Sequence, residues 1–234
     1  MRAVIEEKKK IAKGTLLVSF KLDKEVEFQP GQYSIINLIN PPYNDQKGLS
    51  RHFSIVNSPT QKNKIIMATR LRDSAFKKSL QKLPIGTEVE IEKIGGHFVL
   101  PQNTQRPLVF IAGGIGITPF MSMLFYIQDK SLQHKITLLY SNPDKNSTAF
   151  LEELEEMAKK NPRFTLILTM TKDPSWEGET RHIDAAFLKE YLPHLNSYSY
   201  FIVGPPDMVD VVYKEAIKAG INEEHIKTED FSGY

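Results

Sequence analysis

The chain has 234 residues, of which 41% are hydrophobic and 25% are charged, and its formal net charge is +2. This length allows one large domain or two of ordinary size, and the composition is typical of a globular protein. The small net charge argues against a nucleic-acid-binding surface, and no apolar run is long enough to span a membrane.

Cysteine is absent from the sequence. Its absence excludes disulfides, thiolate zinc sites, cysteine nucleophiles and iron–sulfur clusters held by this chain. The six histidines are scattered without metal-ligand spacing, so we expect no metal site. The N-terminus lacks the apolar core of a signal peptide, which makes the cytoplasm the expected location.

Short β-branched or alternating runs, separated by turn signals such as Pro30-Gly31 and Ser58-Pro59, fill the chain before residue 101. Many short strands at this spacing predict an antiparallel barrel or sandwich. One helix is expected among them, with Ser74 as its cap. The predicted elements are strands over residues 16–20, 32–38, 52–56, 64–69 and 88–91, and a helix over 74–83.

After Pro101 the pattern changes, because predicted strands now alternate with predicted helices. This order predicts a parallel sheet with helices on both faces. The predicted elements are strands over residues 109–112, 136–140, 164–170 and 200–203, with helices over 119–129, 148–160, from 185 onward and over 207–219.

The segment LVFIAGGIGIT, residues 108–118, is followed by Pro119. It predicts a buried strand that ends in a tight turn, where Gly113, Gly114 and Gly116 let the backbone approach a ligand closely. Thr118 is suited to cap a helix and Pro119 to its first position. Unpaired N–H groups at such a helix start attract phosphate, which predicts a diphosphate site; the alternative is a tight turn without a ligand.

A second motif is Arg51-His52-Phe53-Ser54. Arg51 is suited to pair with a phosphate, and Phe53 lies two residues on, which places it on the same face of a strand. A flat ring could stack on Phe53, and Ser54 offers a hydrogen bond. Taken alone, the motif is more typical of a half-buried strand with an ordinary surface arginine.

Both motifs together, in this order, resemble the ferredoxin–NADP reductase superfamily. The likeness covers nearly the whole chain. It includes three further segments: Gln29 to Tyr33, Gly95 to Leu100, and Gly204 to Met208. The resemblance implies a Greek-key β-barrel that binds flavin over residues 1–101, and a Rossmann-like α/β domain that binds NAD(P) over residues 106–234.

For the flavin, the resemblance implies that Arg51 binds a phosphate and Phe53 stacks on the isoalloxazine ring. It implies that Ser54 lies near the flavin N5 and acts in catalysis, and that His52 takes the variable position of the motif. A helix start after Arg72 is expected to hold a second phosphate, which favours FAD over FMN. The other residues expected at the flavin are Thr69, Arg72, Ser74, Ala75 and Phe76, with a plain helix cap as the alternative for Ser74.

For the nicotinamide nucleotide, the resemblance implies a diphosphate site at the glycine turn. The expected residues are Gly113, Gly114, Gly116, Thr118 and Pro119, with Gly204, Pro205 and Met208 on the nicotinamide side. Val203 stands where the family often has cysteine. Ser141 and Lys145 favour NADPH, whereas Asp144 favours NADH, so the preference stays open.

The C-terminal residues resemble the family's terminal strand, which often brings an acid and an aromatic ring to the flavin. Glu229 and Phe231 are therefore expected to act in catalysis. Phe231 or Tyr234 could cover the ring where nicotinamide must bind; the alternatives are packing in the sheet for Phe231 and a frayed end for Tyr234.

The expected function is transfer of hydride from NADPH or NADH to FAD, which passes electrons singly to a separate ferredoxin, flavodoxin or haem protein. Lys77, Lys78 and Lys82 are considered as a docking patch for that carrier, with a solvated helix face as the alternative. Two other functions stay open: a reductase of small acceptors such as ferric chelates, quinones or flavins, and a non-catalytic flavin-binding subunit that senses redox state.

Overall fold

The computed structural model describes residues 1–103 and 105–231. These residues form two compact units. The antiparallel unit comprises Met1–Leu100 and Thr118–Ser131, and the parallel unit comprises the described residues of Pro101–Ile117 and of the chain from Leu132 onward.

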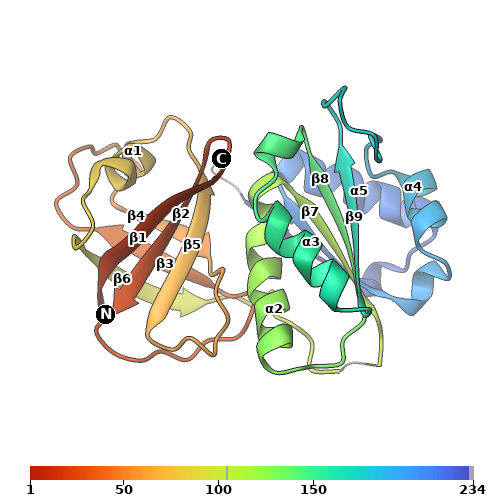
Figure 1. Ribbon diagram of the computed structural model, residues 1–234, viewed down its shortest axis with the longest axis horizontal. Coiled ribbons are helices and arrows are strands. Elements are labelled where there is room, and N and C mark those ends of the chain that lie inside the picture. Colours follow the sequence, from red (N-terminus) through yellow and green to blue (C-terminus); the bar gives the residue numbers. More distant parts are fainter. Residues whose placement is uncertain (104, 232–234) are drawn as a thin grey trace. The chain divides into compact units, whose positions relative to one another are not determined.

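The antiparallel unit contains six strands in the order β4-β3-β6-β1-β2-β5 (Figure 1). Its elements are β1 (Arg2–Ala12), β2 (Thr15–Leu22), β3 (Tyr33–Leu38), β4 (Ser50–Ser54), β5 (Lys64–Arg70), α1 (Ala75–Lys82) and β6 (Glu88–Gly95). All of the pairings between these strands are antiparallel. Alternate residues of each strand point inward and build one apolar core.

Hydrogen bonds join the two ends of this strand order. The backbone N–H of Val56, just after β4, donates to the carbonyl of Ile66 on β5 at 2.8 Å. The N–H of Ile66 donates to the Asn57 side-chain oxygen at 2.7 Å. The sheet therefore curls until its first and last strands meet, as the predicted barrel requires.

Helix α2 (Thr118–Asp129) belongs to the antiparallel unit by its packing, although its strand neighbour in sequence lies in the parallel unit. Ser122 Oγ donates to the carbonyl of Asn57 at 2.8 Å, and Thr60 Oγ1 donates to the Asp129 carboxylate. A boundary near residue 101 alone thus does not describe the division, because the chain also changes units at the start and end of α2.

The parallel unit contains five strands in the order β11-β10-β7-β8-β9, all paired in parallel. Helices lie on both faces of the sheet, with α3 on one face and α4 and α5 on the other (Figure 1). The elements are β7 (Leu108–Gly113), β8 (Ile136–Asn142), α3 (Leu151–Lys160), β9 (Phe164–Met170), α4 (Ala185–Tyr191), β10 (Ser199–Gly204), α5 (Pro206–Ala219) and β11 (Ile226–Asp230).

The two-part architecture of an antiparallel barrel and a parallel α/β sheet is confirmed. Helix α3 starts later than predicted. Residues 145–147 form a separate 3₁₀ turn. Phe150 has a left-handed φ of 59°, which is not helical, so α3 begins only at Leu151. Among the described residues, none of the helices has both the length and the hydropathy needed to cross a bilayer.

Candidate functional site

The first candidate site lies in the antiparallel unit, around the guanidinium of Arg51. Its Nη1 donates to the carbonyls of Lys47, Gly48 and Ser50 at 2.8–2.9 Å. The same guanidinium lies 5.4 Å from the centre of the Phe76 ring. The preceding loop thus fixes the arginine beside helix α1, as a phosphate-binding role requires.

A carboxylate of the chain itself lies at this position. Asp45 Oδ1 is 3.2 Å from Arg51 Nη2, and Asp45 Oδ2 accepts from the backbone N–H of Ala75 at 3.3 Å. Burial opposes ionisation of Asp45, but hydrogen bonds from Lys47 and Ala75 and the Arg51 charge outweigh it and lower its pKa. Asp45 therefore bridges the cation and the helix start that the sequence assigns to a phosphate.

The start of α1 is capped as predicted. Ser74 Oγ accepts from the N–H of Lys77 at 3.2 Å, which confirms the cap and leaves the hydroxyl hydrogen for another partner. Burial, and the nearby charges of Arg72 and Arg51, lower the pKa of Lys77 to about 8. A buried lysine with two arginines close by makes this an electropositive position, suited to an anion.

The proposed carrier-docking patch is not a continuous exposed surface. The Lys77 side chain is buried, and Lys78 pairs with Asp73 at 2.5 Å. Lys82 lies over the ring of Tyr43, with its Nζ 5.2 Å from the ring centre. Lys77 in particular faces the interior, so the three lysines do not act as one surface.

Two residues of the second motif that carry rings, His52 and Phe53, point to opposite faces of strand β4. Phe53 is 7% exposed, and its ring packs against Phe76 with centroids 5.6 Å apart. His52 points to the other face and is exposed, with its ring 5.1 Å from that of Tyr33. Stacking of a flavin on Phe53 stays a prediction. The exposed ring on β4 is that of His52, which lies beside Tyr33 of β3.

Glycine at position 96 leaves room for the Tyr33 ring. A Cβ at Gly96 would lie 3.1 Å from Tyr33 Cδ1, and its φ of 112° disfavours other residues. Ser54 and Thr69, the other residues expected at the flavin on these strands, are both buried. Tyr33 was included in the sequence motif but was not assigned a contact, although its aromatic ring at a strand start was a usable signal.

The second candidate site lies in the parallel unit, where two glycine-containing motifs meet. A Cβ at Gly116 would lie 2.5 Å from the Val203 carbonyl oxygen. A Cβ at Gly204 would lie 2.9 Å from Met208 Sδ, and one at Gly113 would also meet this sulfur. The structure therefore brings together Gly113, Gly116, Gly204 and Met208, at the carboxyl ends of β7 and β10, where parallel sheets bind ligands.

The turn itself differs from the prediction in one respect. Residues 114–117 form a 3₁₀ turn that runs directly into α2, and Thr118 is the first residue of that helix. Thr118 is thus not a separate cap, and Pro119 takes the second helical position. Gly114, the first residue of the 3₁₀ turn, adopts a left-handed φ of 53°, which favours glycine there.

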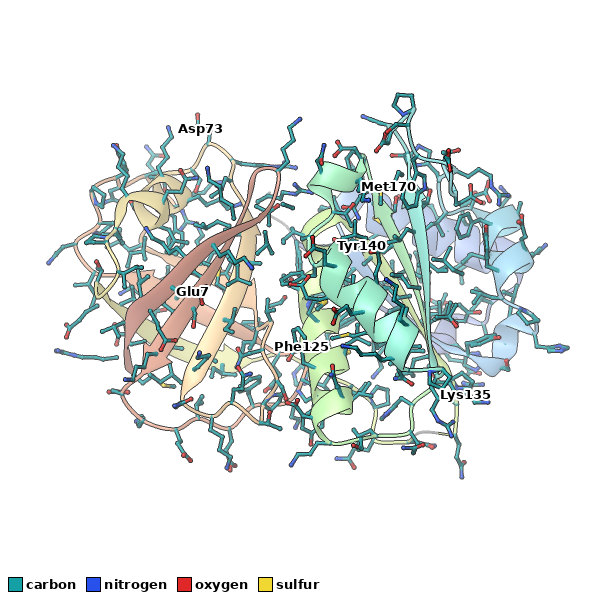
Figure 2. The ribbon with its side chains drawn as sticks, in the orientation of Figure 1. Glu7, Asp73, Phe125, Lys135, Tyr140 and Met170 are labelled. Atoms are coloured by element: carbon teal, nitrogen blue, oxygen red, sulfur yellow. The ribbon has the colours of Figure 1, made fainter. Side chains whose placement is uncertain are left out.

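Tyr140, labelled in Figure 2, supports this turn. Its side chain is fully buried on β8, and its Oη lies 2.9 Å from the carbonyl oxygen of Gly114. From the sequence, Tyr140 was placed only at the start of the segment expected to set nicotinamide preference, and its hydroxyl was given no contact. The signal was its hydroxyl, which needs a partner once it is buried.

The segment expected to select the nucleotide follows β8. Ser141 is partly exposed, whereas Asp144 caps the following 3₁₀ turn by accepting from Ser147 N at 2.8 Å. Lys145 N donates to Asp173 Oδ2 at 3.3 Å. Since the Asp144 carboxylate already accepts from the Ser147 N–H, it is not an unengaged acid for a ribose.

Near the C-terminal end of the described chain, Glu229 pairs with Val203 in the register between β11 and β10. Its Oε2 is buried and has no hydrogen-bond partner among the described residues, and burial raises its pKa to about 7. The N–H of Phe231 donates to the Gly204 carbonyl at 3.2 Å. Phe231 thus contacts Gly204 and Glu229 lies opposite the preceding Val203, while Tyr234 lies outside the described residues.

Residues 110–214 match the family model of the oxidoreductase NAD-binding domain. The solved ferredoxin NADP⁺ reductase of Neisseria gonorrhoeae, with bound FAD and NADP, covers 98% of both chains with a TM-score of 0.80 and 19% identity. The chain therefore shares the two-domain fold of that reductase, and its parallel unit resembles the oxidoreductase NAD-binding domain.

A further solved structure and a relative in sequence are similar over nearly the whole chain. The flavohaem-like FAD/NAD-binding domain of nitric oxide dioxygenase from Vibrio cholerae O1 covers 98% of both chains with a TM-score of 0.84 and 19% identity. The reductase component of phenol 2-monooxygenase from Pseudomonas sp. (strain CF600) is 26% identical over 216 residues, which is 90% of this chain. The chain spans only 60% of that relative's length.

Proposed function

We propose that this chain is the part of an oxidoreductase that binds FAD and takes hydride from NADPH or NADH. The observation that carries the proposal is the anion site of the antiparallel unit, where Arg51 and the Ala75 N–H converge on one carboxylate. A site that binds a carboxylate through a guanidinium and a helix N–H also suits a phosphate oxygen.

These residues fit FAD. Arg51, Ala75 N–H and Ser74 would hold its phosphates, with Lys77 adding positive charge from within the helix. The ring would stack on Phe53, or it would lie on the opposite face of β4, which carries His52 and Ser54. When bound, FAD supplies a hydride acceptor that can release electrons one at a time.

The parallel unit would bind the nicotinamide nucleotide. Gly113, Gly114 and Gly116 would hold its diphosphate, and the region of Gly204, Pro205 and Met208 would receive the nicotinamide. Glu229 and Phe231 border the same strand end, so they would orient the carboxamide or exclude water there. Ser141 would contact the adenosine ribose.

The expected acceptor is a separate one-electron carrier such as a ferredoxin, a flavodoxin or a haem protein, in the cytoplasm. The names of relatives support this, since they include a reductase component of phenol 2-monooxygenase and an electron transfer component of anthranilate 1,2-dioxygenase. A reductase of small acceptors and a redox-sensing subunit are the alternatives.

The proposal is tested by loading the purified chain with FAD or FMN and titrating it anaerobically with NADH and NADPH in turn. We expect FAD to stay bound through gel filtration and its visible absorbance to be lost with at least one nucleotide. Bleaching with turnover on ferricyanide would separate an enzyme from a sensor. A chain that retains neither flavin would contradict the proposal.

A further inference from the structure

We propose that Tyr140 is a positioning residue, which holds the glycine turn in the conformation that binds the nicotinamide nucleotide. The proposed function supplies the ligand on which this inference rests. Beyond it, the Tyr140 hydroxyl on the neighbouring strand, rather than the turn alone, determines the affinity for the nucleotide.

The register of the sheet places Tyr140 beside the turn. Ala112 of β7 pairs with Tyr140 of β8, and Gly113 pairs with Ser141. Tyr140 therefore lies next to the end of β7, where the glycine turn begins. Its ring is fully buried. The Oη lies 2.9 Å from the carbonyl oxygen of Gly114 and 3.3 Å from that of Ala149. One hydroxyl hydrogen serves both acceptors, and the shorter contact is to the turn.

A glycine turn needs such a tie. Gly114 has a left-handed φ of 53°, and two more glycines flank it at positions 113 and 116. Glycines populate many backbone conformations, so a turn made of them loses entropy when a ligand orders it. A hydrogen bond that orders the turn beforehand removes part of this cost from binding.

The hydrogen bond from Tyr140 also fixes the direction of the Ile115 N–H. In a trans peptide, the carbonyl of one residue and the N–H of the next point in opposite directions. Turning the Gly114 carbonyl toward Tyr140 therefore turns the Ile115 N–H away from it. A phenylalanine at position 140 would fill the same space but leave the peptide plane between Gly114 and Ile115 unrestrained. The restraint therefore comes from the hydroxyl and not from the ring.

The chain contains a matched control in Tyr200. This tyrosine is also fully buried, on β10 of the same sheet, and its Oη donates to the Leu195 carbonyl at 2.8 Å. Tyr200 lies near the amino end of its strand, away from the carboxyl ends where the glycine turn lies. Loss of either hydroxyl removes one buried hydrogen bond, but only one of them touches the turn.

The test compares Tyr140→Phe with Tyr200→Phe in the FAD-loaded chain. Dissociation constants for NAD⁺ and NADP⁺ are measured by calorimetry, and KM and kcat with the better reduced nucleotide. For Tyr140→Phe we expect about 3- to 10-fold weaker binding and a raised KM, the effect of one hydrogen bond, with kcat and flavin content unchanged. Tyr200→Phe should bind as the wild type does.

Incorporation of 4-aminophenylalanine at position 140 restores a donor and should restore affinity. Unchanged binding by Tyr140→Phe, or an equal loss in Tyr200→Phe, would overturn the inference. A wild-type chain that binds neither nucleotide would instead overturn the proposed function, and this inference with it.

A second measurement covers the case in which Tyr140→Phe does not fold. Amide hydrogen exchange of residues 115–117 is followed in the wild type before nucleotide is added. Slow exchange supports a turn ordered in advance, whereas exchange as fast as in an open loop would contradict it.

Discussion

Among single residues, Asp45 has the clearest consequence for cofactor binding. Its carboxylate accepts hydrogen bonds from Arg51 Nη2 and Ala75 N, the groups that a flavin phosphate would use. We predict that Asp45→Asn binds FAD several-fold more tightly, because the phosphate no longer competes with a charged group. Quenching of flavin fluorescence measures this affinity.

The control for Asp45 is Asp73→Asn. Asp73 lies two residues before Ala75 but pairs with Lys78 on the surface, so its loss should leave FAD affinity unchanged. Weaker FAD binding by Asp45→Asn would mean that the carboxylate supports the site instead of occupying it.

Glu229 predicts a pH dependence of stability. Its pKa is raised from 4.5 to about 7 in the folded chain because it is buried. Below about pH 4.5 the carboxyl is protonated in both the folded and the unfolded state, so it does not affect the free energy of unfolding. As the pH rises to 7, the carboxyl ionises first in the unfolded state, which stabilises that state. Stability therefore falls across this window, by up to about 3 kcal/mol.

The substitution that tests this is Glu229→Gln. It should unfold at a higher temperature than the wild type near pH 8 and at the same temperature near pH 4, as measured by circular dichroism. Equal midpoints at both pH values would show that the carboxyl is solvated.

Among the elements, helix α1 is held at its C-terminal end by a lysine from β1. Lys8 Nζ donates to the carbonyls of Gln81 and Leu83, at 2.8 and 2.5 Å. Because a cation at a helix C-terminus stabilises unpaired carbonyls, Lys8→Met should lower the free energy of unfolding by about 1–2 kcal/mol. Urea denaturation measures it.

Lys10→Met is the matched control, since Lys10 lies two residues on, along the same strand, and is exposed. We expect less than about 0.5 kcal/mol from it. Lys8→Met should also weaken FAD retention, because α1 carries the anion site at its other end. Equal stability of the two variants would contradict the role given to Lys8.

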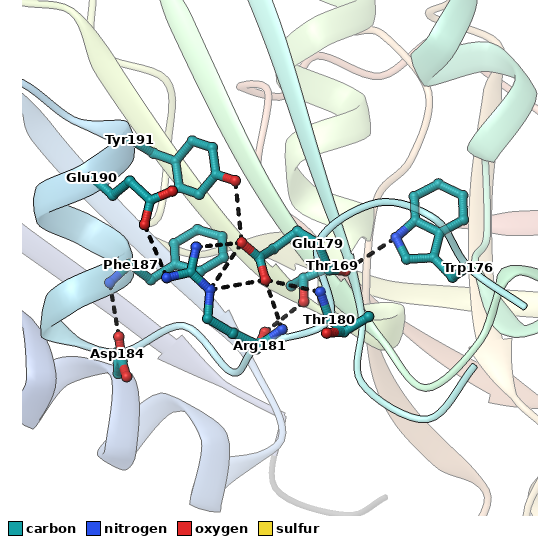
Figure 3. Close-up of polar contacts among 9 residues, drawn as sticks. All are labelled: Thr169, Trp176, Glu179, Thr180, Arg181, Asp184, Phe187, Glu190 and Tyr191. Carbon is teal, nitrogen blue, oxygen red and sulfur yellow. Dashed lines mark hydrogen bonds and ion pairs between the residues drawn. The ribbon is translucent and has the colours of Figure 1, made fainter. Parts of the chain in front are cut away.

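The segment after β9 folds back on this edge strand, as Figure 3 shows. The N–H of Met170 donates to the Glu179 carbonyl, and Thr169 Oγ1 donates to the Arg181 carbonyl. The Glu179 carboxylate pairs with Arg181, accepts from two backbone N–H groups and from Tyr191 Oη, and so its pKa is lowered to about 2. The edge of the sheet is thereby covered.

This carboxylate predicts acid sensitivity. A lowered pKa contributes stability that is present above about pH 4.5 and is lost as pH falls toward 2. Glu179→Gln should lower the unfolding free energy at neutral pH by about 1–2 kcal/mol, after allowance for solvent screening of the exposed Arg181. Glu190→Gln, which removes only the outer partner of Arg181, should have less effect. Equal losses in thermal unfolding would contradict this ranking.

Strand β1 was only partly predictable from the sequence. Its residues Glu6 to Lys10 are all charged, so Lys8, Lys9 and Lys10 are expected on a surface strand or turn, whereas β1 lies within the sheet, between β6 and β2. Two of these charged side chains find partners in other elements. Glu6 pairs with Lys64 of β5, and Lys8 donates to a carbonyl at the C-terminal end of α1. A bulge between Ile5 and Glu7 shifts the register. These tertiary partners are invisible to a periodicity argument.

Over the whole molecule, the change of hydrophobic period near residue 101 was enough to predict a barrel followed by a parallel sheet. The grouping of Gly113, Gly204 and Met208 around one nucleotide was implied by the family resemblance. The packing of α2 with the antiparallel unit did not, because Ser122 and Asp129 find their partners near Asn57 and Thr60, far away in sequence. The Asp45 carboxylate at the anion site was missed for the same reason.

The central claim is that hydride passes from a nicotinamide nucleotide to FAD held by this chain. It is tested most directly by anaerobic rapid mixing of the FAD-loaded chain with NADH or NADPH, each with hydrogen or deuterium at the transferring C4 position. We predict loss of flavin absorbance in a single turnover, slowed by deuterium on one face of the ring. Flavin that stays oxidised with both nucleotides would contradict the account.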